Sequence, residues 1–175
     1  MEFKETLLAR RSVRQFTDEP VSDEDIERIL EAGMLAPTGK GINPRHYITV
    51  QDPERIRSLI GCRQGGPAML KTATAAIAVL GDTTASDTCI EDSSVALENM
   101  HLAASALGLG SCWLQVRLRP SEEEGVSTEE FLRKRLGFPE TMELEALLVL
   151  GHPAKIPAPH TLGGLPQGTV HKEQW

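Results

Sequence analysis

The stretch Arg10-Arg11-Ser12-Val13-Arg14 places three guanidinium groups and a hydroxyl within five residues near the N-terminus. The rest of the chain is acidic, and the formal net charge of its 175 residues is −7. Clustered like charges raise the free energy unless an anion lies among them. An arginine fork can donate two parallel hydrogen bonds to two oxygens of a phosphate. Our hypothesis is therefore a site for a phosphorylated small molecule, and the alternative is a solvated basic helix end.

Length and composition indicate a single globular domain. The chain is 40% hydrophobic and 25% charged, and it is long enough to bury a core without disulfide or metal support. The acidic balance argues against a nucleic-acid partner, because neutralising a phosphate backbone needs a broad basic surface. No apolar stretch approaches the roughly 20 residues that a membrane helix needs. With no signal peptide in view, we expect a soluble, cytoplasmic protein with no membrane partner.

Cysteine and histidine spacing argues against metal and disulfide chemistry. Cys62, Cys89 and Cys112 are odd in number and lack metal-site spacing, so we expect free thiols in a reducing compartment. The five histidines show no pairing at helical spacing, which argues against a metal site. His101 lies inside a predicted helix, and we interpret it as a packing residue whose polar atoms are satisfied.

Hydrophobic periodicity and capping residues predict alternating helices and strands. Pro37 ends the second helix because proline disfavours helical geometry in the residue before it. The longest helix has apolar or small residues on both faces of its later half, so we expect it to be the most buried; Gly108 supplies its left-handed end. The predicted helices are 2–10, 22–36, one from Asp52-Pro53, a short piece at Met69-Leu70, 90–107 and 127–137, and the predicted strands are 47–50, 75–80, 111–116 and 145–150.

Four motifs follow one another along the chain. After R-R-S-x-R come A-P-T-G-K-G-I-N-P-R-H-Y-I-T-V (36–50), A-L-G-L-G-S-C-W-L (106–114) and L-L-V-L-G-H-P (147–153). Their order and spacing resemble the FMN-dependent nitroreductase family over nearly the whole chain. The resemblance implies an α+β fold, with a central, mostly antiparallel β-sheet flanked by helices. It also implies an intertwined homodimer with FMN bound between the subunits.

The predicted domain organisation follows from the same pattern. We expect one FMN-binding domain over residues 1–153. Residues 154–175 contain many Pro and Gly residues and no hydrophobic periodicity. We expect them to form an extended C-terminal tail that belongs to the same domain or makes a dimer contact.

The resemblance also implies a function. Such proteins are FMN-dependent NAD(P)H oxidoreductases of the nitroreductase, quinone reductase or flavin reductase type. NADH or NADPH gives a hydride to flavin N5, and a small electron acceptor then takes the vacated position, so the kinetics are ping-pong. The cofactor carries the chemistry, and no catalytic protein residue is assigned. One alternative is a flavin-binding or regulatory relative with little reductase activity, and another is a small phosphate-ligand binding or scaffold domain.

Site residues are implied by matching this chain to the family motifs. The basic motif matches the segment that grips the FMN phosphate and ribityl chain. The loop after the second helix matches one that approaches the flavin ring from the partner subunit. Asn43 stands where the family usually has Gln, which implies a flavin or loop-positioning contact, and the alternative is a plain turn residue. The end of the third strand lies beside flavin N5 and O4. The implied cofactor-binding residues are Arg10, Arg11, Ser12, Arg14, Pro37, Thr38, Gly39, Asn43, Leu114 and Gln115.

The chain departs from the family pattern in three places. The family loop often reads Asn-x-Gln-Pro-Trp, whereas this chain has Gly41-Ile42-Asn43-Pro44-Arg45, which changes the wall of the substrate cavity or its support. Many relatives have a basic residue in the tail that reaches the phosphate, and none stands at the matching place near His160. The extra helical insertion of longer relatives is also missing, so we expect a more open site. The pair Gly65-Gly66 falls near the family's pyrimidine-edge contact, but the match is loose.

Overall fold

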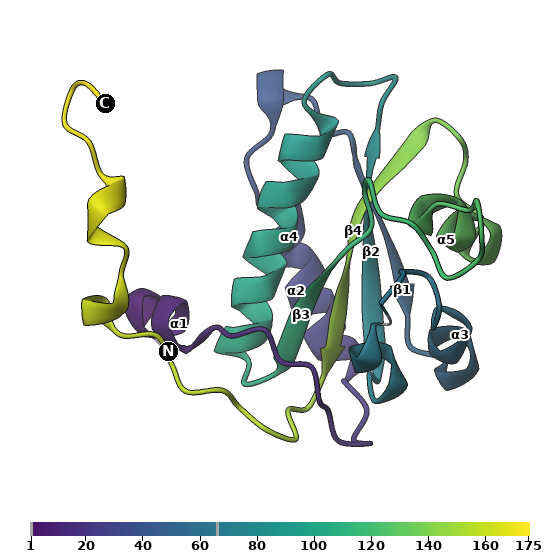
Figure 1. Ribbon diagram of the computed structural model, residues 1–175, viewed down its shortest axis with the longest axis horizontal. Helices are drawn as coiled ribbons and strands as arrows, with labels where there is room; N and C mark the ends of the chain where they lie inside the picture. The colour runs from purple at the N-terminus through teal and green to yellow at the C-terminus, as the bar shows by residue number, and fades with distance from the viewer. Residues whose placement is uncertain (1, 66) are drawn as a thin grey trace.

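A four-stranded sheet with the order β1-β2-β4-β3 organises the computed structural model, which describes residues 2–65 and 67–175 (Figure 1). Each of the three strand pairings is antiparallel, as predicted. β3 lies at one edge of the sheet and pairs with β4 on its inner side. The strands are β1 Arg45–Val50, β2 Ala75–Asp82, β3 Gly110–Gln115 and β4 Met142–Gly151.

Helices cover both faces of this sheet. α2 and α4 pack on one face, whereas α3 and α5 pack on the other (Figure 1). The helix bounds are α1 Phe3–Ala9, α2 Asp23–Met34, α3 Pro53–Ser58, α4 Cys89–Ala106 and α5 Thr128–Leu136. The predicted elements are therefore present, with ends that differ by up to three residues. α2, for example, ends at Met34 rather than at the predicted Ala36.

Side chains along β2 point alternately to the two faces of the sheet, so this one strand contributes to both hydrophobic cores. Ile77 and Val79 face α2 and α4, whereas Ala78 and Leu80 face the side of α3 and α5. Because helices cover both faces, the strand is a continuous apolar run instead of an alternating one. The structure thus confirms the strand predicted over 75–80 and extends it to Asp82.

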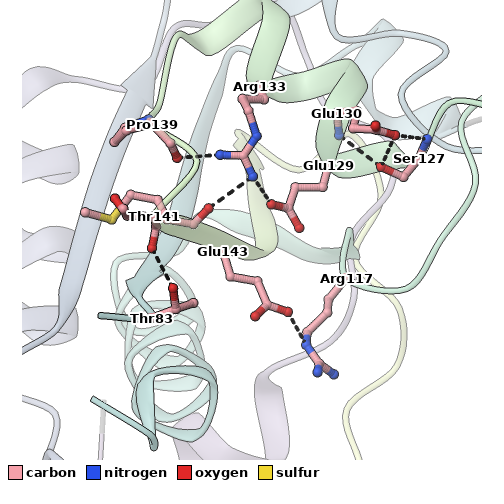
Figure 2. Close-up of polar contacts among 10 residues, drawn as sticks. Thr83, Arg117, Ser127, Glu129, Glu130, Arg133, Pro139, Thr141 and Glu143 are labelled. Atoms are coloured by element: carbon pink, nitrogen blue, oxygen red, sulfur yellow. Dashed lines mark hydrogen bonds and ion pairs between the residues drawn. The ribbon is translucent and has the colours of Figure 1, made fainter. Parts of the chain in front are cut away.

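Capping residues define both ends of α5. The Ser127 side chain accepts a hydrogen bond from the Glu130 backbone, and the Glu130 carboxylate accepts one from the Ser127 backbone (Figure 2). Gly137 ends α5 with a φ of 76°. Arg133 donates to the carbonyl oxygens of Pro139 and Met142, and these contacts tie α5 to the start of β4 (Figure 2).

The long helix α4 packs closely on α2 and leaves an apolar surface beside it. A Cβ on Gly33 would lie 2.9 Å from Met100 Cγ and Sδ, so the methionine side chain would have to shift to admit a larger residue at this crossing. Phe3, Leu35 and Val95 are 73%, 83% and 42% exposed on α1, at the end of α2 and on α4. Exposed apolar groups gathered over neighbouring elements are typical of a protein–protein contact.

The segment after β4 leaves the body beside α1 (Figure 1). Its base is tied down where Ala154 donates its N–H to the Gln15 carbonyl at 3.0 Å. Further on, His160 donates its N–H to the Leu8 carbonyl at 2.8 Å, and beyond it the residues are exposed. In the part of the chain that the structure describes, no helix is long and apolar enough to cross a membrane.

The three cysteines are buried free thiols, which confirms the sequence prediction for their bonding state. Burial raises the pKa of Cys62 to about 12, so this thiol stays protonated. Cys112 is 1% exposed and packs in the core as a small apolar residue. The thiols therefore fill space in the cores.

Candidate functional site

The basic motif runs alongside the edge strand β3. Val13 donates its N–H to the Ser111 carbonyl at 2.9 Å, and Ser12 forms a parallel bridge with Ser111. Val13 is buried in the core beneath the motif, whereas the Arg14 side chain is exposed. The sheet edge thus holds the motif extended, and the backbone alternation sends neighbouring side chains to different sides.

A cavity of about 410 Å³ opens where Arg14 meets the end of β3. Two cationic side chains, Arg14 and Arg63, contribute to its lining, and Trp113 supplies an aromatic wall. The cavity therefore combines positive charge with a flat apolar surface, which suits a ligand that has an anionic group and an aromatic ring system. Its other lining residues are Gln64, Gly65, Pro67, Ala68, Met69 and Leu114.

Arg10 points away from this cavity, toward α4. Its Nη1 lies 3.1 Å from His101 Nε2, and its Nε lies 3.7 Å from a Glu98 carboxylate oxygen. Arginine has no acceptor, so His101 Nε2 accepts this bond and the ring proton is on Nδ1, from which it is donated to Ser111 Oγ. Burial, aided by the Arg10 charge, lowers the pKa of His101 to about 4, so the ring stays neutral. His101 is thus a buried residue with satisfied polar atoms, as predicted.

The arginines of the motif diverge instead of converging. Arg11 donates through Nη1 to the carbonyl of Ala158 in the tail. Arg14 Nη1 lies 3.4 Å from the Ser12 carbonyl at the mouth of the cavity. Within one chain, then, the structure brings Arg14 to the cavity and directs Arg10 and Arg11 to other partners.

The predicted loop residues lie at the N-terminal end of α4. Thr38 Oγ1 donates to Asp92 Oδ2 at 2.8 Å, and the Gly39 N–H donates to Asp92 Oδ1 at 2.9 Å. Asn43 Oδ1 accepts a hydrogen bond from Arg45 Nε at 2.9 Å. The cavity at Trp113 is lined by none of these loop residues.

At the end of β3, side chains hold one another in place. Trp113 Nε1 donates to Gln115 Oε1 at 2.8 Å, and Gln115 Nε2 lies 3.5 Å from Glu145 Oε1. Glu145 is only 6% exposed, and burial raises the pKa of its carboxyl group. Glu145 lies at a register shift in the pairing of β2 with β4, and a β-bulge of this kind changes the direction in which a side chain points. Leu114 is 1% exposed and packs into the core.

Sequence reasoning missed several of these residues. Arg63 lies between two turns and carries no local signal that would connect it to Arg14. Asp92 and Glu145 look in sequence like ordinary polar positions of a helix and a strand. Gly65 lines the cavity, whereas its neighbour Gly66 lies outside the described residues. No group of three or more His, Cys, Asp or Glu side chains among the described residues is arranged to hold a metal ion.

Comparison with known proteins places this geometry in a family. The model of the nitroreductase family matches residues 7–88 and 63–152, which together span most of the chain. The chain belongs to the nitroreductase family. A protein of Archaeoglobus fulgidus, provisionally named NADH dehydrogenase/NAD(P)H nitroreductase, is 41% identical over 151 residues, which is 84% of this chain and 83% of that relative.

Solved structures of nitroreductases share the fold. An FMN-dependent nitroreductase from Clostridium difficile superposes with a TM-score of 0.93 at 33% identity, covering 97% of this chain and 98% of its own. A provisionally assigned nitroreductase from Desulfovibrio desulfuricans, solved in complex with FMN, has a TM-score of 0.78 at 27% identity, covering 100% and 98% of the two chains. The predicted α+β fold is thereby confirmed for this nitroreductase.

Proposed function

We propose that this nitroreductase is an FMN-dependent NAD(P)H oxidoreductase that passes electrons from NADH or NADPH to a small acceptor. The observation that carries the proposal is the cavity in which Arg14 and Arg63 meet the aromatic wall of Trp113. FMN has a matching division into an anionic phosphate and a flat ring system. Relatives of this chain are named for FMN and NAD(P)H chemistry, and one of them was solved with FMN bound.

The residues of the chain fit this cofactor by the chemistry of their donors. Arg14 and Arg63 would hold its anionic groups, and Trp113 and Met69 would pack on apolar parts of the ring. β3 is an edge strand whose outer side pairs with the basic motif at Ser111, so the outward backbone N–H groups beyond Ser111 would be the donors to the cofactor. FMN, when bound, supplies the two-electron chemistry, and the protein binds and orients it.

A homodimer completes the proposal. The exposed apolar surface over α1, α2 and α4 includes a depression of about 420 Å³ between Phe3, Leu35 and Ala103. A second copy would cover this surface and bring its own loop of Pro37, Thr38 and Gly39 toward the cavity. Residues 154–175, which are tied to the body at Ala154 and His160, would belong to the same domain as residues 1–153 or contact the partner. The buried free thiols support a reducing compartment such as the cytoplasm.

An anaerobic titration tests the function directly. Trp113 lines the cavity and Trp175 is 100% exposed, so a Trp175→Phe variant leaves Trp113 as the only indole reporter. Added FMN should quench its fluorescence, and NADH or NADPH should then bleach the visible flavin spectrum. A protein that binds FMN but is reduced by neither nucleotide would be a flavin-binding relative without reductase activity. Failure to bind FMN would contradict the whole proposal.

A further inference from the structure

We propose that Arg45 and Asp92 are positioning residues that hold the loop of residues 36–43 in the shape in which it meets the flavin of the neighbouring subunit. The part of this inference that concerns the flavin and the dimer rests on the proposed function. The hydrogen bonds of Arg45 and Asp92 to the loop, which we call the clamp, are contacts within one chain. Neither residue is among those matched to FMN contacts. Arg45 moreover stands where the family motif often has Trp.

Arg45 holds the loop from the side of the sheet. It is the first residue of β1, it pairs with Gly81 of β2, and it is only 6% exposed. Its Nη2 donates to the Ala36 carbonyl at 2.9 Å, and its Nη1 lies 3.3 Å from the Pro37 carbonyl. Its Nε donates to Asn43 at the other end of the loop. One planar fork thus joins the two ends of the loop, which an ammonium group cannot do with the same geometry.

The positive charge of Arg45 also lies near the negative end of the α2 helix dipole. α2 ends at Met34, and the Ala36 and Pro37 carbonyls that Arg45 contacts lie just beyond that end. A helix C-terminus carries partial negative charge, so a cation there is stabilised. The buried guanidinium is therefore compensated by carbonyl oxygens and the helix end.

Asp92 holds the middle of the loop from the side of α4. It lies in the first turn of that helix and is 6% exposed. Both carboxylate oxygens are engaged, Oδ1 by the Gly39 N–H and Oδ2 by the Thr38 hydroxyl. Thr88 Oγ1 lies 3.4 Å from Oδ2 on the same helix end. Asp92 is thus a shared acceptor that fixes two consecutive loop residues to α4.

The loop has a shape that needs such support. Lys40 and Gly41 have φ values of 57° and 71°. Unlike glycine, Lys40 has a Cβ, which clashes with the backbone in this left-handed region. Gly39 lies so close to α4 that a Cβ there would overlap Thr88 Oγ1 and lie 3.2 Å from Thr88 Cβ. Residues in unfavourable backbone conformations persist where surrounding contacts determine them. Asp92 fixes Gly39 just before Lys40 and Gly41, and Arg45 fixes Asn43 just after them.

The clamp also determines what the loop can offer a ligand. The Thr38 hydroxyl and the Asn43 side-chain oxygen are both used within the chain. The Thr38 oxygen keeps acceptor lone pairs and Asn43 keeps its two amide N–H donors, so the loop would offer the flavin these groups, its backbone and the Pro37 ring. Changes at Arg45 or Asp92 should alter flavin binding although neither side chain touches the cofactor.

The first experiment measures loop order in the flavin-free protein. Trypsin cleaves after Lys40, and mass spectrometry of the fragment that ends there gives the cleavage rate. We expect Arg45→Lys and Asp92→Asn each to speed this cleavage about tenfold, because each weakens charge-assisted hydrogen bonds. Glu24→Gln is the control for the acid, because it removes an exposed ion pair with Arg28 on α2 and should change the rate less than about twofold. Arg57→Lys on the surface of α3 is the control for the arginine.

The second experiment measures flavin binding by the full-length dimer. Arg45→Lys and Asp92→Asn should raise the FMN Kd about tenfold and change the visible circular dichroism of the bound flavin, whereas the two controls should match the wild type. If either variant fails to fold, Thr38→Val removes one hydrogen bond to Asp92 and should show both effects in smaller degree. Unchanged cleavage or unchanged FMN affinity in the folded variants would overturn the inference. A wild type that binds no FMN would instead refute the proposed function, and the cleavage rates would still test the clamp.

Discussion

Mild acid should destabilise this protein through one buried histidine. His101 is 3% exposed, and burial together with the Arg10 charge lowers its pKa from 6.5 to about 4. Between these two values the imidazole of the unfolded chain binds a proton and that of the folded chain does not. The unfolded state therefore binds more protons in this window, and stability falls as the pH falls from about 6.5 toward 4. At about 1.4 kcal/mol per pH unit, lowering the pH from 7 to 5 should remove about 2 kcal/mol from the free energy of unfolding.

The variant His101→Gln isolates this contribution. Glutamine can accept from Arg10 and donate to Ser111 as the histidine does, but it does not titrate. Urea unfolding should be followed between pH 7 and pH 5 at one protein concentration, because the stability of a dimer depends on concentration. The wild type should lose about 2 kcal/mol more than the variant over this range. Equal pH dependence of the two proteins would refute the view that burial keeps His101 neutral.

Four further changes test the site and the fold. Arg14→Met should weaken FMN binding by about 1.5–3 kcal/mol, measured by quenching of Trp113 fluorescence. Gly39→Ala should lower the free energy of unfolding by about 1–3 kcal/mol because its Cβ would overlap Thr88 Oγ1, and Thr88→Ala in the same chain should restore part of the loss. Leu35→Glu places a charge on the exposed apolar surface and should shift the protein toward monomer in light scattering. Ser127→Ala removes an α5 cap and should cost about 1 kcal/mol in thermal or urea unfolding, without changing FMN affinity.

Local signals predicted the secondary structure because each acts within a few residues. Ser127 and Glu130 form the capping box at the start of α5, and Gly137 ends the helix with a positive φ that glycine adopts easily. The apolar run of 75–80 identified β2, since a strand buried on both faces has few polar positions. The ends of the elements differ more from the prediction. β4 begins at Met142 instead of the predicted position 145, because the polar residues at its start interrupt the apolar run.

Contacts between distant segments were beyond the reach of such signals. Thr38 and Asp92 are 54 positions apart, and no feature of either segment shows that they meet. In the sequence, Arg45 is only a departure from the family motif, and the motif alone does not distinguish an effect on the cavity wall from one on its support. The structure shows that its side chain supports the loop.

By itself, the sequence determined the succession of helices and strands, the presence of a basic motif and the family to which its spacing belongs. Only the tertiary structure decided what each arginine of that motif does. Arg14 lines a cavity, Arg10 binds His101 on α4 and Arg11 binds the tail. The physical reason is that Arg10 closes α1 whereas Arg14 follows the bridge of Ser12 to β3, so what each side chain meets depends on which distant segments pack there.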